Sequence, residues 1–445
     1  MLRRGVFILA ILASAWPVAA QSGNSATLTL DQAVQQALVG NRPVKAASMM
    51  PDRVDKQIEA LRTQRLPNFD LRSFGGSLLA PIYFDFPAGS FGNYEATGPI
   101  PFTDTSIKSP ALPALGVLFT VAQPLTQLHK ISLGTKVLET SRDLAREDLR
   151  QKQADLVTSV KKVYYGLLET RALLATLAEA ESLVTELQRE VKEYVSRQVA
   201  LPGDEMTVEV RLAETALEKV KTESALLGLR DQLNLLLGRD LSEPLEVVMP
   251  PQPEADVDLT TAQRRALEHR PEVHDAVLKA KQAGYAVQVK QADFLPDVSV
   301  MVSYLGMYNV AVLPRDTLGA GIYLTWEPFD WGRRRLEREA SQKTADAATI
   351  GIAEAREQVL ADVNASVRAL TEARAALRVA ELTATAADEN LRVARSRYSQ
   401  QASLLRDVLE AQLAVASARQ KQQHAQLATW IARAELERAM GDAAP

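Results

Sequence analysis

The chain has 445 residues, of which 51 are lysine or arginine and 55 are aspartate or glutamate, so its net charge is −4, and it contains no cysteine. A mildly acidic chain without a basic, aromatic-rich patch is a poor binder of nucleic acid. The lack of cysteine excludes disulfides, thiolate metal sites, cysteine nucleophiles and a lipid on an N-terminal cysteine.

The first 20 residues have the composition of a secretory signal peptide. Arg3 and Arg4 form a charged start, residues 5–15 an apolar segment, and residues 18–20 a small-residue cleavage site. The apolar segment is shorter than the ~20 residues that a membrane-spanning helix needs. The sequence therefore predicts export, with an N-terminal membrane anchor as the alternative.

A pattern near residue 40 returns near residue 270. Residues 37–43 (ALVGNRP) precede Leu66-Pro67, and residues 266–271 (ALEHRP) precede Leu295-Pro296. A repeat of this length indicates a duplicated half-protein rather than a solenoid unit.

We therefore expect two structural repeats, residues 21–240 and residues 259–445. Between them, residues 241–258 hold four prolines among acidic residues and are predicted to be an exposed linker.

Two helices are predicted at the start of the first repeat, at residues 31–40 and 44–65. The period of the apolar residues then changes from 3.6 to 2, which predicts a β-hairpin over about residues 68–124. Its connection, residues 81–113, carries six prolines. It is predicted to be a long surface loop.

The second repeat has the clearer strands, a predicted β-hairpin over about residues 297–328. Val298, Val300, Val302 and Tyr304 alternate with polar or flexible neighbours, and residues 306–319 are expected to form the turn region.

Each hairpin is followed by a helical pattern of about 70 residues, residues 131–199 and 332–401, which corresponds to roughly 100 Å of helix. Return helices are expected at about residues 206–237 and 404–440. Apolar residues recur at intervals of seven, which is typical of coiled coils. The predicted coiled-coil helices thus cover about residues 130–238 and 332–440.

One chain therefore offers only four strands, too few to close a sheet in a membrane, where an open edge would leave backbone groups unpaired. If the hairpins enter a bilayer, several copies must assemble. Trp326, Phe329 and Trp331 are predicted to form an aromatic belt at one membrane boundary, with Tyr304 toward the other. The alternative is that these aromatics fill the core of a soluble sheet.

These features resemble the TolC family of outer membrane efflux proteins over essentially the whole chain after residue 20. The resemblance rests on the Asn-Arg-Pro and His-Arg-Pro turns, the paired Leu-Pro strand entries, residues 325–332 (TWEPFDWG) and Tyr398 followed by residues 407–412 (DVLEAQ). It implies a mainly α fold with a small membrane β part. In such a fold, two tandem repeats of helix, β-hairpin and long helical hairpin trimerise into a twelve-stranded β-barrel that continues into a twelve-helix α-barrel.

The function that the resemblance implies is the outer-membrane channel-tunnel of a tripartite efflux or type I secretion system in a Gram-negative bacterium. Its partners would be two further copies, a periplasmic adaptor (membrane fusion) protein, an inner-membrane transporter and outer membrane lipid. No cofactor and no nucleic acid are expected.

The resemblance also implies a periplasmic gate at the helix tips. Asp407, Glu410 and Tyr398 match the gating segment of the family, and Asp204 matches the gating aspartate of the first repeat through a one-residue insertion. Gln401 replaces the usual glycine of the turn. Three copies of the acids around a narrow lumen would favour cations. The alternative is that they are ordinary solvated acids.

The turns beside the gate are the predicted adaptor-docking tips, formed by Leu201, Pro202 and Gly203 in the first repeat and Ser403 and Leu404 in the second. The alternative is a pair of tight turns without a partner.

Two other classes of protein fit the sequence less well. The four histidines form no metal-spaced group, and the sequence has no nucleophile elbow or phosphate-binding glycine loop, so an enzyme is not predicted. A soluble periplasmic coiled-coil adaptor or scaffold is the alternative function, although such proteins usually combine one helical hairpin with compact β domains.

Overall fold

The computed structural model describes residues 27–77, 79–109, 113–198, 201–250, 258–309, 314–400 and 402–442. The predicted signal peptide, Gln401 and most of the Pro-rich part of the predicted linker lie outside these residues. The described chain separates into two compact units. The tip unit consists of residues up to 40, 160–254 and 380–427, and the sheet unit of residues 41–159, 255–379 and 428 onward.

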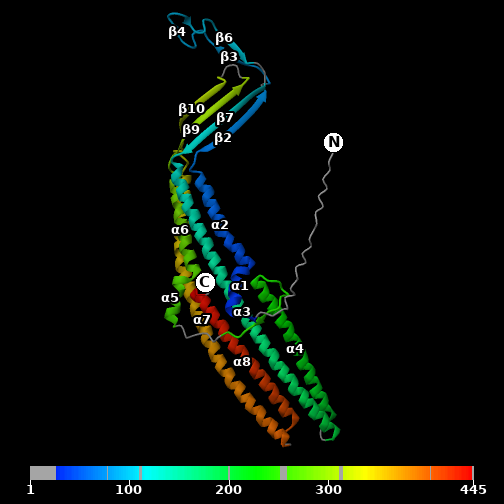
Figure 1. Ribbon diagram of the computed structural model, residues 1–445. Helices are drawn as coiled ribbons and strands as arrows, with labels where there is room; N and C mark the ends of the chain where they lie inside the picture. Colours follow the sequence, from blue (N-terminus) through cyan, green and yellow to red (C-terminus); the bar gives the residue numbers. More distant parts are fainter. Residues whose placement is uncertain are drawn as a thin grey trace, which may run out of the picture. The chain divides into compact units, whose positions relative to one another are not determined.

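The sheet unit contains a four-stranded antiparallel sheet (Figure 1). Its strands are β2 (Asn68–Ser77), β7 (Pro113–Pro124), β9 (Asp297–Tyr308) and β10 (Asp316–Thr325), in the order β10-β9-β7-β2. Both pairs of strands lie where the alternation of apolar residues predicts them. The turn between β9 and β10 is shorter than expected, because the strands continue to Tyr308 and resume at Asp316.

The register divides this sheet into two chemically different faces. Phe69, Val121 and Val302 lie in line across three strands. Because side chains alternate along a strand, every second residue of each strand points to the same face as these three. We call it the apolar face; its apolar members are Phe69, Leu71, Leu115, Val117, Phe119, Val121, Val298, Val300, Val302, Tyr304, Leu318, Ile322 and Leu324.

The opposite face, here called the mixed face, carries mostly small and polar residues. These are Asn68, Asp70, Arg72, Ala114, Gly116, Thr120, Ala122, Asp297, Ser299, Ser303, Thr317, Gly319, Gly321 and Thr325. Larger apolar side chains are interspersed, such as Phe74 and Leu305.

Residues 81–113 do not form the predicted loop. They contain a two-stranded ladder of β3 (Ile82–Phe86) and β6 (Thr105–Ser109), and a smaller one of β4 (Asn93–Tyr94) and β5 (Gly98–Pro99). The prediction was wrong because most of the prolines lie at the ends of these strands, which leaves the segments IYFDF and TSIKS free to pair. We call residues 82–109 the arm; Figure 1 shows it beyond the end of the sheet that is farther from the helices.

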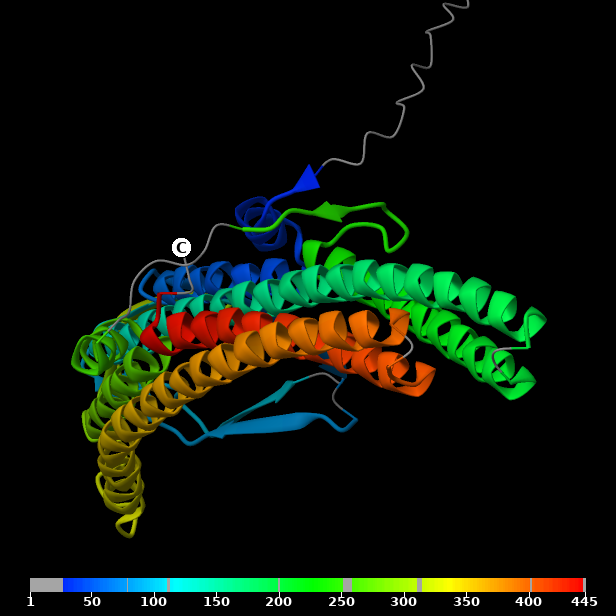
Figure 2. The ribbon, with the colours of Figure 1, turned by 90° about the horizontal axis from the view of Figure 1, so that it is seen from below.

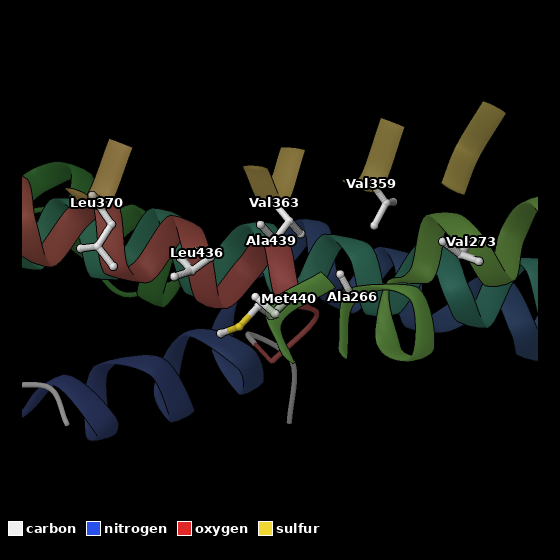
Figure 3. Packing of buried hydrophobic residues seen from close by; sticks show 10 residues of the cluster. Ala266, Val273, Val359, Val363, Leu370, Leu436, Ala439 and Met440 are labelled. Carbon is white, nitrogen blue, oxygen red and sulfur yellow. The ribbon is translucent and has the colours of Figure 1, made fainter. Parts of the chain in front are cut away.

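The helices of the sheet unit surround a small aliphatic core. They are α2 (Arg42–Thr63), α5 (Leu259–His269) and α6 (Pro271–Ala292), with parts of α3 (Gln127–Ser196), α7 (Arg333–Ser399) and α8 (Leu405–Met440). Val359, Val363 and Leu370 occupy one stripe of α7 at helical spacing and pack with Leu436 and Met440 of α8 (Figure 3).

Arg270, between α5 and α6, is almost fully buried beside this core. Its guanidinium pairs with Glu272 at 2.8 Å and with Asp362 of α7 at 3.3 Å. A buried charge is tolerated only when it is paired, so the Arg-Pro turn of the second repeat serves as a structural anchor.

The tip unit contains α1 (Leu30–Gly40), α4 (Pro202–Leu237) and the adjoining parts of α3, α7 and α8. Its apolar contacts include Val184, Leu187 and Val191 of α3 with Val208 of α4. A second group is formed by Ala384, Ala387, Val415 and Ala418, whose small side chains allow α7 and α8 to approach closely.

Part of the predicted linker is not exposed. β8 (Glu246–Val247) pairs in parallel with β1 (Thr27–Leu28), as Figure 2 shows, and Val247 is buried. The hydroxyl of Tyr164 lies within hydrogen-bond distance of the carbonyl oxygens of Leu28 (2.8 Å) and Val248 (2.6 Å), either of which can take its single proton, and it accepts from the Val248 N–H (3.0 Å). This tyrosine therefore ties both short strands to α3.

In the described part of the chain, no helix has the length and apolar character that a membrane crossing requires.

Candidate functional site

The apolar face of the sheet is widely exposed. Leu71, Leu318 and Ile322 have exposed fractions of 69%, 76% and 76%. A contiguous apolar surface across four strands is unusual in water and marks a surface that meets lipid or protein. In the described chain, β2 and β10 are both edge strands with one neighbour each. Open edges of this length invite pairing with another chain.

The mixed face borders a hollow of about 920 Å³ near the end of α2. Seven mixed-face residues line it: Asn68, Ala122, Pro124, Asp297, Ser299, Tyr323 and Thr325. The sheet therefore combines an apolar side with a side that has room and polar groups for water.

The predicted belt aromatics lie at two different ends of the sheet. Trp326 follows β10 directly, and Phe329 and Trp331 lie in the loop before α7, with exposed fractions of 57%, 68% and 89%. The rings of Phe329 and Trp331 contact each other edge to face at 4.8 Å. Tyr304 lies nearer the arm on the apolar face, where its hydroxyl donates to Asp316.

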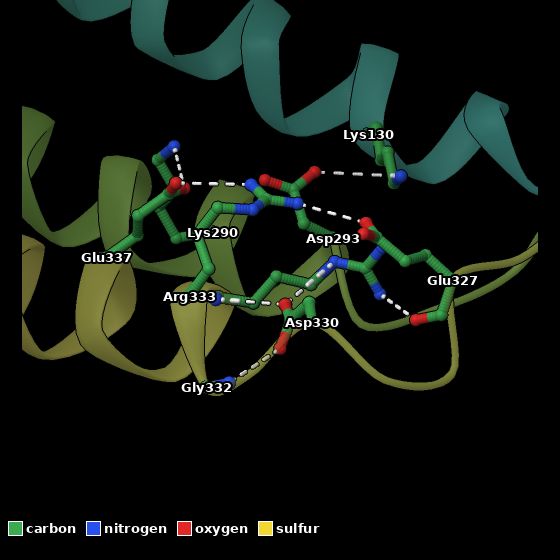
Figure 4. A network of polar contacts seen from close by, with 9 residues as sticks. Lys130, Lys290, Asp293, Glu327, Asp330, Gly332, Arg333 and Glu337 are labelled. Carbon is green, nitrogen blue, oxygen red and sulfur yellow. Dashed lines mark hydrogen bonds and ion pairs between the residues drawn. The ribbon is translucent and has the colours of Figure 1, made fainter.

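A group of charged residues fixes the junction between helices and strands (Figure 4). Lys130, at the start of α3, lies 3.0 Å from Asp297 of β9 and 3.6 Å from Asp293 at the end of α6. Arg333 reaches Glu327 at 3.0 Å and Glu337 at 3.2 Å. Lys290 of α6 pairs with the same Glu337 at 2.9 Å. Ion pairs therefore connect α6, α7 and the loop of residues 326–332 that precedes α7.

Asp330 caps α7 within this group. Its carboxylate accepts hydrogen bonds from the N–H groups of Gly332 and Arg334, each at 3.0 Å. These bonds, the Arg334 one foremost, and the nearby arginine charges hold the pKa of Asp330 below its usual range. The turn also needs positive φ angles at Trp331 (57°) and Gly332 (84°), and glycine adopts such a conformation without a steric penalty.

Two of the predicted gate acids hold the starts of the return helices. The Asp204 carboxylate accepts from the Leu201 N–H, and the Asp407 carboxylate from the Leu404 N–H, both at 3.1 Å. This is one half of a helix capping box, in which the carboxylate at the third helical position accepts from the N–H of the residue before the helix; leucine cannot supply the other half. Glu410 is exposed and pairs loosely with Arg406 at 3.5 Å.

Tyr398 lies against Tyr194, edge to face at 6.3 Å, so the ends of α3 and α7 are adjacent in the tip unit. Burial raises the pKa of Tyr398, and the neighbouring Tyr194, Glu190 and Asp204 add to the effect. The structure thus brings Tyr398 and Asp204 into one neighbourhood.

The predicted docking tips are partly exposed. Leu201 and Leu404 have exposed fractions of 72% and 67%, and Pro202 and Gly203 form the first turn of α4. The hydroxyl oxygen of Ser403, by contrast, is buried without a hydrogen-bond partner. Only the leucines offer a broad apolar contact.

Sequence reasoning missed Tyr164 and Lys130. Tyr164 follows the buried Val157 by seven residues, so the coiled-coil spacing could have placed it on the buried side of α3. No sequence signal predicts its hydrogen-bond partners. Lys130 finds partners on β9 and after α6, more than 160 residues away. In the described residues, no group of three or more His, Asp or Glu could hold a metal ion.

Comparisons with known proteins agree with this geometry. The family model "Outer membrane efflux protein" matches residues 263–442. No curated protein is similar enough in sequence to be matched.

Several solved structures share the fold. The CmeC outer membrane channel of Campylobacter jejuni has a TM-score of 0.76 at 16% identity, covering 93% of this chain and 86% of its own. VceC of Vibrio cholerae has a TM-score of 0.72 at 16% identity, with coverages of 93% and 96%. A membrane protein of Pseudomonas aeruginosa has a TM-score of 0.75 at 18% identity, with coverages of 93% and 90%. Residues 263–442 thus match the outer membrane efflux protein family, and nearly the whole chain has the fold of solved outer membrane channels.

Proposed function

We propose that the chain is the outer-membrane channel-tunnel of a tripartite efflux or type I secretion system of a Gram-negative bacterium. Substrates would pass through it from an inner-membrane pump, across the periplasm and out of the cell. The observation that carries this proposal is the sheet with an exposed apolar face, a mixed face and two open edges.

The apolar face meets lipid and the mixed face meets water. β2 and β10 have ten residues and β7 and β9 have twelve, which suits tilted strands crossing a bilayer. The exposed Trp326, Phe329 and Trp331 then lie at the periplasmic boundary, where aromatic residues are favoured, and Tyr304 lies toward the outer boundary.

The open edges require partner copies. An edge strand in lipid would leave unpaired N–H and C=O groups, each costing several kcal/mol. Pairing β2 of one copy with β10 of the next satisfies both edges and keeps the antiparallel alternation. With the trimeric assembly of the family, three copies contribute four strands each and enclose a lumen lined by the mixed face.

The helices extend into the periplasm and carry the contacts to the rest of the system. The tips, with the exposed Leu201 and Leu404, dock onto a periplasmic adaptor that is bound to an inner-membrane transporter. Apolar side chains exposed at a turn are typical of a docking surface.

The gate lies beside these tips. Asp407, Glu410 and Asp204 supply negative charge at the lumen entrance, and Tyr398 packs against Tyr194 to hold the ends of the long helices together. This role needs no catalytic group, so we infer transport without enzymatic turnover.

Membrane fractionation and conductance test the proposal. The chain should be found in the outer membrane fraction, run as a heat-modifiable trimer, and conduct ions in planar bilayers after detergent purification. A soluble periplasmic monomer without conductance would contradict the proposal and favour the adaptor or scaffold alternative.

A further inference from the structure

The arm is a built structure with its own hydrogen bonds. The Ala88 N–H donates to the carboxylate of Asp104 at 2.8 Å. Further backbone bonds run from Gly89 N–H to Pro101 O, Phe91 N–H to Ile100 O and Ile100 N–H to Gly92 O, each at 2.9 Å. The rings of Phe86 and Phe91 contact each other at 5.1 Å. The arm therefore has one defined conformation in which to present its side chains.

The ladder of the arm is amphipathic. Phe84 lies opposite Ile107, and with Ile82 and Phe86 they form one apolar side. Asp85 lies opposite Ser106 on the other side, next to the pair of Tyr83 and Lys108. We call the side of Ile82, Phe84, Phe86 and Ile107 the apolar side of the arm.

Within the described chain this apolar side is only partly covered, since Phe86 packs against Phe91 while Ile82 and Ile107 stay exposed. β3 and β6 pair only with each other, and Ile82 and Ile107 have exposed fractions of 45% and 41%. Phe102, beside the ladder, has an exposed fraction of 76%. A two-stranded ladder is marginally stable alone in water and needs a third strand or a packing partner.

The position of the arm in the sheet indicates which partner it has. The arm follows β2, an open edge strand, and begins just beyond Ser77, the last residue of that strand. In the proposed assembly, β10 of the next copy pairs with β2. The start of that β10, Asp316, then stands next to the base of the arm because neighbouring strands are antiparallel.

The net charge of the arm favours a protein rather than a lipid surface as its partner. Residues 82–109 contain three acids (Asp85, Glu95, Asp104) and one lysine (Lys108), a net charge of −2. Anionic headgroups would repel such a segment. In the next copy, the exposed Arg315 directly before β10 offers the arm a complementary charge.

We propose that the arm clasps the neighbouring copy of this chain across the seam between β2 and β10. Its apolar side lies against the start of the neighbour's β10, and its acids lie near the neighbour's Arg315. This rests on the proposed trimeric channel. The arm is then an assembly element that strengthens the seam from outside the membrane.

Photo-crosslinking in the full-length protein tests the proposal. The photoreactive amino acid p-benzoylphenylalanine replaces Ile107 on the apolar side or, as the matched control, the adjacent Ser106 on the opposite side. Irradiation of the outer membrane should give covalent dimers and trimers of this chain for the Ile107 position and not for the Ser106 position. Adducts with lipopolysaccharide alone, or equal yields from both positions, would overturn the proposal.

An arm deletion gives a second readout. Replacing residues 82–109 by a short Gly-Ser turn should lower the temperature at which the trimer dissociates in detergent, while conductance persists because the sheet and helices are unchanged. An unaltered dissociation temperature would overturn the clasp. Native electrophoresis before irradiation separates the two hypotheses, since absence of any trimer in the unmodified protein would contradict the proposed function itself.

Discussion

At the start of α8, the carboxylate of Asp407 accepts a 3.1 Å hydrogen bond from the backbone N–H of Leu404. Asp204 and Leu201 make the same bond at the start of α4, also at 3.1 Å. A carboxylate in the first turn of a helix also interacts favourably with the helix dipole. The two halves therefore use the same device to begin their return helices, and the acids proposed for the gate have a structural task as well.

Removing this cap should loosen the tip. Asp204→Ala should lower the local opening free energy of the first turns of α4 by about 0.5–1.5 kcal/mol, the usual net contribution of one hydrogen bond. Hydrogen exchange of the α4 amides measures this change. Glu205→Ala is the matched control, because Glu205 lies in the same turn. Equal effects of both substitutions would contradict the capping role.

The charge of the gate should set ion selectivity. Asp407→Asn combined with Glu410→Gln should lower the preference for cations, because the lumen entrance loses its negative ring. Reversal potentials across a salt gradient in planar bilayers measure this preference. Glu410→Gln alone removes charge without removing a cap, since the carboxylate of Glu410 pairs with Arg406 whereas that of Asp407 bonds the helix start. Glu59→Gln on α2 is the control, and an unchanged reversal potential in the double variant would count against the gate.

The tips should be required for adaptor binding. Leu201→Asp with Leu404→Asp should reduce copurification with the adaptor and leave trimers intact, because the exposed leucines would become charged without disturbing a core. Leu217→Asp is a matched control, since Leu217 is an exposed leucine of α4 away from the tip, with an exposed fraction of 57%. Normal copurification of the double variant would argue for turns without a partner.

Periodicity predicted the parts of the fold that depend on local pattern. The two helices at the start of the first repeat, the long helices with their return helices, and the four long strands lie where the apolar spacing placed them, because period 3.6 and period 2 specify which side of an element is buried; α5 and α6 were not predicted. The arm was missed because the prolines of residues 81–113 were counted together. Proline prevents strand pairing only at its own position, and the paired segments 82–86 and 105–109 contain none. The pairing of β8 with β1 was missed because two residues carry no periodicity.

In the candidate site, too, the features set by local sequence pattern could be predicted and those set by tertiary packing could not. The apolar face could be predicted, since alternation along each strand determines it. Partners distant in sequence could not, because Lys130 with Asp297 and Tyr398 with Tyr194 meet only through tertiary packing. The capping bonds of Asp204 and Asp407 were readable in principle from a carboxylate three residues after the start of a helix.

The two faces of the sheet should respond oppositely to charge. Val302→Arg on the apolar face should prevent membrane assembly, because an arginine facing lipid near the bilayer midplane costs about 2–4 kcal/mol. Ser303→Arg, the adjacent residue on the mixed face, should leave the trimer intact and change the selectivity of conductance. Outer membrane yield and planar bilayer recordings measure both. Assembly of the Val302 variant, or loss of the Ser303 variant, would contradict the assignment of the faces.

The cap of α7 should make the junction sensitive to acid. Hydrogen bonds from Arg334 and Gly332 lower the pKa of Asp330, so its ionised form is stabilised by folding. For a lowered pKa, that stabilisation is complete above the unfolded value of about 4 and is lost as the pH falls through the folded value.

Asp330→Asn keeps an oxygen that can accept the two hydrogen bonds and removes the titration. The unmodified protein should therefore be more stable than the variant at neutral pH, and the difference should shrink below about pH 4. Thermal unfolding across pH measures this difference, with Asp316→Asn as a control acid outside the junction. A difference that stays constant down to the acid limit would mean that Asp330 stabilises the turn through shape alone, because only the charged form depends on pH.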